Sequence, residues 1–282
     1  MPQIRAATPS PAMDSPIPGG PAPSDGPAQP EACPHCHGTG WRITADGGAG
    51  KAMRCSCSQN RRRHDYLDLA GIPERYRTCR LDKFNIKNPD PKVAQQLLRA
   101  RNISRKYIDT FFDPGRNGFR RAGLLYLGPP GTGKTHLAVA VLRELIETYG
   151  LRGKFVDFTT LLHDIQATFN NRSTETKATI LAPVMHADVL VLDELGAQKP
   201  TEWAMDNLYL IINTRYTAGR PTLFTSNCRL ESSKGVKDGI ELLQNRISAA
   251  LVSRLYEMTQ AVSLEAPDYR RAVMMHQNRI GG

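Results

Sequence analysis

The stretch at residues 128–135, GPPGTGKT, constrains the fold of this chain more than any other part of it. It fits the pattern G-x-x-x-x-G-K-[ST], and apolar runs precede and follow it. Because glycine tolerates positive φ, successive backbone N–H groups can converge on an anion. The N-terminus of a following helix adds a partial positive charge. A chance glycine-rich turn would not need an apolar run before and after it. The pattern therefore predicts a strand, a phosphate-binding loop and a helix.

The side chains of this loop indicate how it would hold a nucleotide. The Lys134 ammonium can reach the β- and γ-phosphates, and the Thr135 hydroxyl can hold Mg²⁺. The residues expected to contact ATP in this stretch are Gly128, Pro129, Pro130, Gly131, Thr132, Gly133, Lys134, Thr135 and His136.

Downstream of the loop, apolar runs alternate with helical stretches, which predicts an α/β fold with a central parallel sheet flanked by helices. Strands are expected at 154–158, 189–192, 221–227 and 260–264. Helices are expected from 160 towards 169, at 201–216, at 242–255 and from 267 to about 278. Before the loop, residues 91 to about 112 predict a helix and 113–123 a polar loop.

Polar residues follow two of these strands at the edge where open parallel sheets bind ligands. Asp193 and Glu194 end the second strand, and Asn227 ends the third. We expect Asp193 to organise Mg²⁺ and Glu194 to orient or activate the attacking water. Asn227 would bind that water or the γ-phosphate. The alternative is that the two acids only cap the next loop.

Arginines near the C-terminus supply cations that phosphoryl transfer requires. Arg254 would contact the nucleotide of a neighbouring subunit, whereas Arg270 would reach a nucleotide in its own chain. Surface positions and contacts to nucleic-acid phosphates are the alternatives, and spacing alone does not decide between them.

A second chemical signal lies near the N-terminus, where C-x-x-C is followed after eighteen residues by C-x-C. Two cysteine pairs at this separation predict a tetrahedral zinc site that closes a small ribbon. In a weaker variant His35 or His37 replaces one cysteine. The expected ligands are Cys33, Cys36, Cys55 and Cys57.

Composition limits the possible partners and the location. The formal charge of +10 and the sequence pI near 9.5 favour a polyanionic partner, although they also serve solubility. The sequence contains no apolar run long enough for a transmembrane helix and no apolar segment typical of a secretory signal. We therefore expect a cytoplasmic protein with no membrane partner.

The chain is expected to divide into four parts. Residues 1–31 hold nine prolines and predict a disordered tail, and 32–60 form the zinc ribbon. Residues 61–88 form a basic linker, which either contacts nucleic-acid phosphates or is exposed to solvent. Residues 89–282 form the ATPase domain.

Taken together, the motifs GPPGTGKTHLA, VLVLDELG, PTLFTSN, SRL and DYR resemble the DnaC/DnaI-type helicase loaders and the IstB-type transposition ATPases, which are AAA+ proteins. The resemblance runs from about residue 33 to 271. It implies Walker A roles for Lys134 and Thr135, Walker B roles for Asp193 and Glu194, and a sensor role for Asn227. It also implies an arginine finger at Arg254, although Ser253 replaces the usual acid before it, with Arg246 as the second candidate. A sensor-2 role for Arg270 and a reduced or absent helical lid are implied as well.

The same resemblance implies partners. The ribbon would dock a replicative helicase of the DnaB type, and ATPase domains would self-associate around single-stranded DNA. Candidate DNA contacts are Phe169, Asn170, Arg172 and Lys177, although Phe169 is equally suited to core packing. Loading that helicase is the first hypothesis, and a transposition helper that recruits a transposase is the second. A chaperone or adaptor that binds only protein is the third.

Overall fold

The computed structural model describes residues 33–36, 41–44, 51–113, 115, 118–169, 175–197, 201–230 and 241–271. The chain divides into two compact units, Met1–Met53 and Arg54–Gly282. Near the N-terminus β1 (Trp41–Thr44) and β2 (Lys51–Arg54) form a two-stranded sheet, where the sequence predicts a hairpin between the cysteine pairs. The expected tail at 1–31 lies outside the described residues.

A five-stranded parallel sheet forms the centre of the second unit, which confirms the predicted α/β class. Its spatial order is β6-β7-β8-β5-β9, so β8 lies between the strand that leads into the phosphate loop and the strand that ends at Asp193. The strands are β5 (Gly123–Leu127), β6 (Gly153–Asp157), β7 (Val189–Asp193), β8 (Thr222–Ser226) and β9 (Thr259–Ser263).

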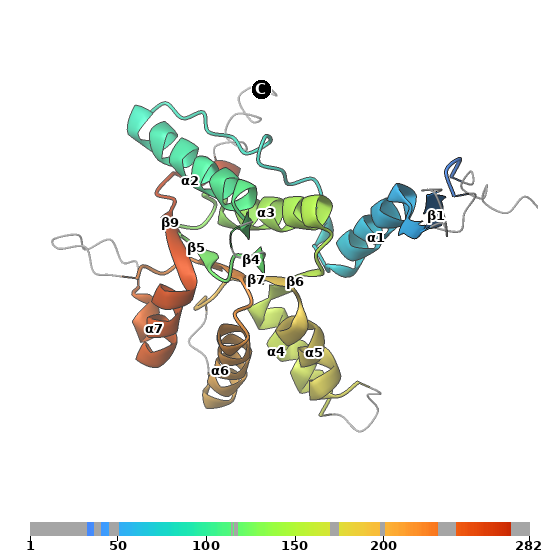
Figure 1. Cartoon of the computed structure of the whole chain (residues 1–282). Helices are drawn as coiled ribbons and strands as arrows, with labels where there is room; N and C mark the ends of the chain where they lie inside the picture. The colour runs from blue at the N-terminus through green and yellow to red at the C-terminus, as the bar shows by residue number, and fades with distance from the viewer. Residues whose placement is uncertain are drawn as a thin grey trace, which may run out of the picture. The chain divides into compact units, whose positions relative to one another are not determined.

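Helices cover both faces of this sheet (Figure 1). On one face lie α1 (Ser56–Leu69), α2 (Pro91–Asp109) and α3 (Lys134–Tyr149). On the other lie α4 (Phe158–Ala167), α5 (Lys177–His186), α6 (Glu202–Thr217) and α7 (Ala249–Met258). No helix in the described part of the chain is both long enough and apolar enough to span a bilayer.

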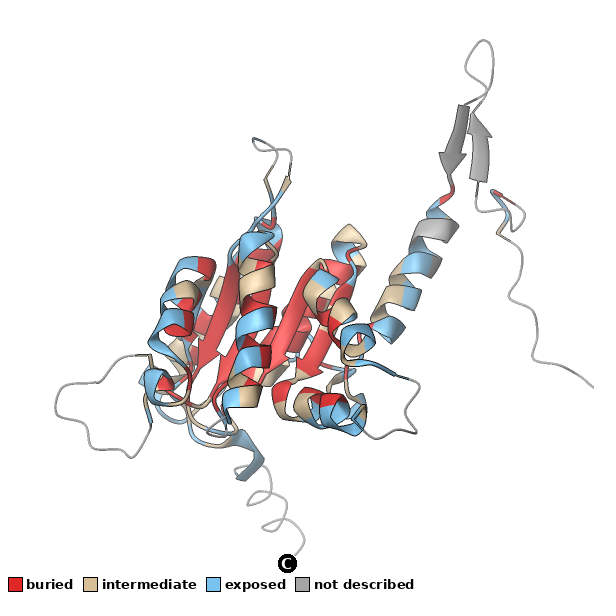
Figure 2. Cartoon of the chain, turned by 90° about the horizontal axis from the view of Figure 1, so that it is seen from below, coloured by how far each residue is buried: buried red, intermediate tan, exposed pale blue. Residues whose placement is uncertain are grey.

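The alternation of side chains along the strands divides the core into two apolar clusters. On β5, Leu124 and Tyr126 pack with α2 and α3, whereas Leu125 and Leu127 pack with α4 to α7. Both clusters are buried, and the strands between them are buried along their whole length except at the edges (Figure 2). This two-sided burial explains why the strands read as continuous apolar runs in the sequence.

Several elements differ from the sequence expectation. Residues 177–186 form α5, which was not predicted, because Pro183 interrupts a short apolar stretch and hides its helical period. The expected helix at 242–255 is instead η2 (Leu243–Asn245) followed by α7, since Ser248 caps a new helix by accepting from Leu251 N. Arg246 therefore lies outside α7.

The segments that precede the sheet are also more regular than expected. The basic run at residues 61–64, read as part of a linker, lies within α1, which packs on α3. The polar loop expected at 113–123 contains a small antiparallel pair, β3 (Phe112–Asp113) and β4 (Gly118–Phe119). Between α1 and α2 the chain forms the 3-10 turn η1 (Glu74–Tyr76).

A fully buried arginine on α6 hydrogen-bonds to the end of α5 and to the start of β8. The Arg215 guanidinium, on α6, donates to Thr222 Oγ1 at 2.8 Å and to the carbonyl oxygens of Pro221 at 2.7 Å and Ala187 at 2.9 Å. It also donates to Val184 O at 3.0 Å, at the end of α5. Burial lowers the pKa of Arg215 to about 9. Carbonyl oxygens therefore replace the water that a guanidinium normally binds.

We expect Arg215→Ala to destabilise the fold by about 3 kcal/mol or more, because several buried acceptors would lose their donor. The measurement is the free energy of unfolding from urea titration. Arg152→Ala is the matched control: its side chain is exposed and pairs with Asp188 at 3.0 Å, so its loss should cost less than about 1 kcal/mol. Equal costs for the two variants would contradict this role for Arg215.

Candidate functional site

The phosphate loop runs from β5 to α3 with two glycines in conformations that other residues rarely adopt. Gly131 has φ +78°, and a Cβ there would lie 1.8 Å from Asp268 Oδ1. Gly133 has φ +95°, and a Cβ there would lie 2.6 Å from Phe84 Cε2. Both positions therefore require glycine for conformation and for space. The cradle of backbone N–H groups that the sequence predicted is compatible with a phosphate chain.

Lys134 is the first residue of α3 and is buried beside the loop. Its Nζ donates to Gly128 O at 2.8 Å and to Pro129 O at 2.7 Å. Burial lowers the pKa of Lys134 to about 8, because few water molecules can solvate the ammonium. The ammonium is thus held at the loop, where it can pair with phosphate oxygens.

One carboxylate oxygen of Asp193 links the loop helix to the sheet. Asp193 Oδ1 accepts a hydrogen bond from Thr135 Oγ1 at 2.9 Å and from Thr225 Oγ1 at 2.6 Å. Burial raises the pKa of Asp193, and the two hydroxyl donors oppose that rise. A hydroxyl and a carboxylate at this distance are ligands that suit Mg²⁺, so the two side chains fit the predicted metal role.

Glu194 turns away from the strand immediately after Asp193. Its φ is 60°, in the left-handed region, and its backbone N–H donates to Thr225 Oγ1 at 3.0 Å. Leu195 N also donates to Thr225 O at 2.8 Å. Thr225 therefore holds both acids in place, and this buried residue was not among the predicted site residues. Its position on a strand neighbouring β7 is the signal that points to it.

A large cavity of about 950 Å³ opens beside the loop. It brings together most of the predicted nucleotide residues, from Pro130 to His136, with Glu194, Asn227 and Arg270. It is also lined by Pro89 and by residues of the predicted linker at 61–88, namely Arg75, Tyr76, Lys83, Phe84, Asn85, Lys87 and Asn88. The nucleotide cavity is therefore formed partly by the segment upstream of the ATPase core.

Two of the residues expected at the nucleotide have additional contacts. His136 Nε2 lies 2.9 Å from Arg80 O, and burial lowers the pKa of this imidazole. Arg270 Nε lies 3.3 Å from Asp268 Oδ1 at the start of the last described helical turn. Tyr269 N donates to Gly131 O at 3.1 Å, which ties this turn to the phosphate loop.

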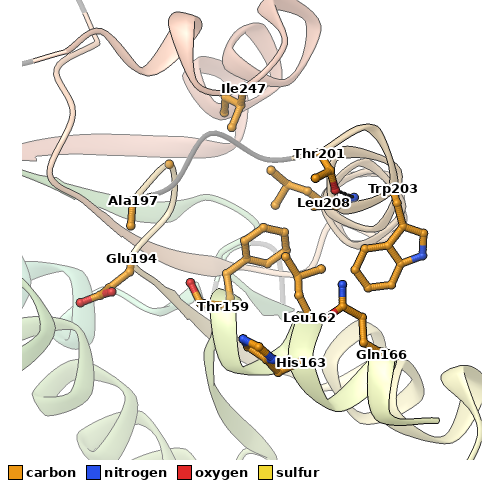
Figure 3. A pocket seen from close by; sticks show the side chains of 13 residues that line it. Thr159, Leu162, His163, Gln166, Glu194, Ala197, Thr201, Trp203, Leu208 and Ile247 are labelled. Carbon is orange, nitrogen blue, oxygen red and sulfur yellow. Dashed lines mark hydrogen bonds between the residues drawn. The ribbon is translucent and has the colours of Figure 1, made fainter. Parts of the chain in front are cut away.

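A second, smaller cavity of about 170 Å³ lies on the other side of Glu194, between α4 and α6. Figure 3 shows Glu194 at its edge, with Thr159, His163 and Gln166 from α4 and Trp203 from α6 around it. Glu194 lines both cavities and is therefore a wall residue common to the two.

The two finger candidates do not line the nucleotide cavity of their own chain. Arg254 Nη2 donates to Tyr209 Oη at 3.0 Å, and its guanidinium carbon lies 4.6 Å from the centre of that ring. Arg246 pairs with Glu241 at 2.5 Å.

Two of the four predicted DNA contacts, Phe169 and Lys177, lie among the described residues. Phe169 is 63% exposed, so it is not a core residue, and it packs edge-on against Trp203 with ring centres 6.1 Å apart. Lys177 begins α5. Asn170 and Arg172 lie outside the described residues.

The four predicted cysteines form one cluster. The Sγ atoms of Cys33, Cys36, Cys55 and Cys57 all lie within 4.8 Å of one another. Four thiolates bonded to zinc at about 2.3 Å would be roughly 3.8 Å apart, so the donor set and spacing fit that ion. His35 is exposed and outside the cluster, and His37 lies outside the described residues.

Comparisons with known proteins agree with this geometry. A family model described as "IstB-like ATP binding protein" matches residues 58–276. The phage-like element PBSX protein XkdC of Bacillus subtilis (strain 168) is 26% identical over 244 residues, covering 83% of this chain and 84% of XkdC. The replicative helicase loader DnaC of Escherichia coli (strain K12) is 28% identical over 168 residues, covering 58% of this chain and 62% of DnaC. The match thus covers less than two thirds of the length of that relative.

A solved structure gives the same relationship. The crystal structure of the DnaC helicase loader superposes with a TM-score of 0.55 and 30% identity, covering 68% of this chain and 99% of that one. The parallel sheet and the phosphate loop define an ATP-binding ATPase of the AAA+ class. The chain belongs to the family of IstB-like ATP-binding proteins and is related to the DnaC helicase loaders.

We expect Thr225→Val to lower Mg²⁺-dependent ATP turnover about tenfold or more, because Asp193 and the Glu194 backbone would lose a shared partner while the buried volume is kept. Steady-state phosphate release measures this. Thr217→Val is the control, since its exposed hydroxyl donates to Asn213 O within α6. Wild-type turnover in Thr225→Val would show that this hydroxyl does not organise the acids.

Proposed function

We propose that this protein is an ATP-dependent loader that places a replicative helicase of the DnaB type on single-stranded DNA. The observation that carries the proposal is the 30% identity to the DnaC helicase loader across 99% of that solved chain. The four-cysteine cluster and the charge of +10 add support, since the first suits a docking module and the second a nucleic-acid partner.

The nucleotide site supports ATP hydrolysis through residues with separate tasks. Lys134 would pair with the phosphates, and Thr135 and Asp193 would hold Mg²⁺, which would supply positive charge to the phosphate oxygens. Glu194, which lines the cavity, would orient water for in-line attack and accept its proton. Asn227, at the end of the neighbouring strand, hydrogen-bonds that water or the γ-phosphate.

Assembly would complete the site. Arg270 lines the cavity of its own chain and would bind its nucleotide, whereas Arg254 would reach the nucleotide of a neighbouring subunit. ATP binding would thus favour self-association, and hydrolysis would release the helicase. Arg246 is the alternative finger.

The division of labour along the chain follows from this proposal. The cysteine cluster would hold Zn²⁺ in a ribbon at 32–60 that docks the helicase, after a disordered tail at 1–31. Residues 61–88 would connect this ribbon to the ATPase domain at 89–282, which would carry a reduced or absent lid. Protein and DNA would meet in the cytoplasm, without a membrane partner.

Single-stranded DNA would bind near the start of α5. Phe169 is exposed and can stack on a base, and Lys177 can contact a phosphate. Asn170 and Arg172 are further candidates in the same stretch of sequence.

A transposition helper is the second candidate function, because the matching family model is described as IstB-like. In that case the same ATPase core would bind DNA and recruit a transposase. The identity of the retained partner distinguishes the two functions.

We expect Cys55→Ser to lower the zinc content from about one ion per chain to near none, because a tetrahedral site would lose a ligand. Elemental analysis of the purified full-length chain measures this, and nucleotide affinity should not change. Cys228→Ser, a buried cysteine outside the cluster, should keep the ion. Full zinc retention in Cys55→Ser would refute the four-cysteine site.

The decisive experiment for function is co-elution of the full-length chain with candidate partners in the presence of ATP. We expect a DnaB-type helicase to co-elute, and the affinity to fall at least tenfold for Cys55→Ser. Lys134→Ala, which should not bind ATP, tests whether the complex needs the nucleotide. Retention of a transposase and not a helicase would favour the second candidate.

A further inference from the structure

Two tyrosines on α6 hold the guanidinium of Arg254, which lies on the adjacent helix α7 (Figure 1). Arg254 Nη2 donates to Tyr209 Oη at 3.0 Å. The guanidinium carbon lies 4.6 Å from the ring centre of Tyr209 and 5.9 Å from that of Tyr216, within the range of cation–π attraction. Tyr216 Oη donates to Glu257 Oε2 at 2.7 Å, so the second ring is itself tied to α7.

This guanidinium is bound differently from that of Arg215, which joins elements within the fold. Every nitrogen of the Arg215 guanidinium donates to an oxygen of the chain. Arg254 has one hydrogen bond to the described residues, and its Nη1 is buried without a hydrogen-bond partner among them. A buried cationic donor without an acceptor costs free energy, so this arrangement is poorly suited to a purely structural arginine. The contact with Tyr209 instead fixes the direction of the side chain.

The donors that remain on Arg254 suit a phosphate. Tyr209 takes one Nη2 proton and Nη1 is buried, so Nε–H and the second Nη2–H are left within the described part of the chain. Two donors on different nitrogens of one planar group can bind a phosphate in a bidentate manner. Tyr209 is 43% exposed, so the pair can be approached from outside the chain. The nucleotide cavity of the same chain is not lined by Arg254.

We propose that Tyr209 is a positioning residue, which holds the Arg254 guanidinium so that its remaining donors meet the phosphates of a nucleotide bound by a second copy of this chain. This rests on the proposed role of Arg254 as the arginine finger. It adds the residue that orients the finger, so the ring of Tyr209 contributes to hydrolysis without contacting the nucleotide.

The test compares ATP turnover per chain in dilute full-length protein and at a concentration where sedimentation with ATP shows assembly. The wild type should gain turnover on assembly, because the finger then reaches a nucleotide. Tyr209→Leu should lose this gain, whereas Tyr209→Phe, which keeps the ring, should keep part of it. Leu210→Ala is the control, since it removes an exposed neighbour on the same helix and should keep the full gain. An unchanged or larger gain in Tyr209→Leu would overturn the proposal.

Arg254→Ala separates this inference from the function on which it rests. If Arg254→Ala loses the gain and Tyr209→Leu keeps it, only the role of Tyr209 fails. If Arg254→Ala keeps the gain, or if the wild type shows none, Arg254 is not the finger, and the inference fails with that assignment.

A transition-state mimic provides a readout that a merely structural tyrosine would not change. A positioned arginine acts on the charge that develops during phosphoryl transfer and not on bound ADP. Assembled Tyr209→Leu should therefore bind a fluorescent ADP analogue with the affinity of the wild type, but bind it about tenfold more weakly when aluminium fluoride is present. Equal weakening in both conditions would show that Tyr209 supports the fold and does not position the finger.

Discussion

The candidate site depends on a single oxygen atom, Asp193 Oδ1, which accepts from the hydroxyls of Thr135 and Thr225. These donors come from the helix after the phosphate loop and from the strand between β5 and β7. The oxygen can accept from both hydroxyls only because the strand order places β8 between β5 and β7. Since this carboxylate is buried, each hydroxyl donor is worth more than it would be in water. Strand order, loop and acids therefore act as one unit.

The nucleotide cavity is not built by that unit alone. Phe84 packs where a Cβ on Gly133 would lie, and Tyr76 lines the cavity, so residues upstream of α2 form part of its wall. The same upstream stretch is fixed to α3 through Arg80 and Arg143. In a protein proposed to pass its nucleotide state to a partner held by its N-terminal part, this shared wall provides a short physical connection.

Local patterns predicted the centre of the structure well. The loop, the strand ending at Asp193 and the buried strand before Asn227 each have a signature within a few residues, because backbone geometry and two-sided burial act locally. Features that depend on distant partners were not predicted. Thr225 gains its role, and Tyr76 its place in the cavity wall, only from neighbours far away in the sequence, and α5 was hidden by Pro183. The roles of Arg254 and Arg270 depend on groups that a single chain does not contain, so they stay predictions.

The strand order also has a consequence for how the chain acquires its structure during synthesis. β5 pairs with β8 and β9, and Leu124 of β5 is opposite Leu223, almost a hundred residues later. On a ribosome, the strand that leads into the phosphate loop emerges long before either neighbour exists, whereas β6 and β7 can pair earlier. Its apolar residues therefore lack both neighbouring strands until α6 has been made. Because such late pairings slow folding, this delay is the interval in which the nascent chain is most exposed to aggregation.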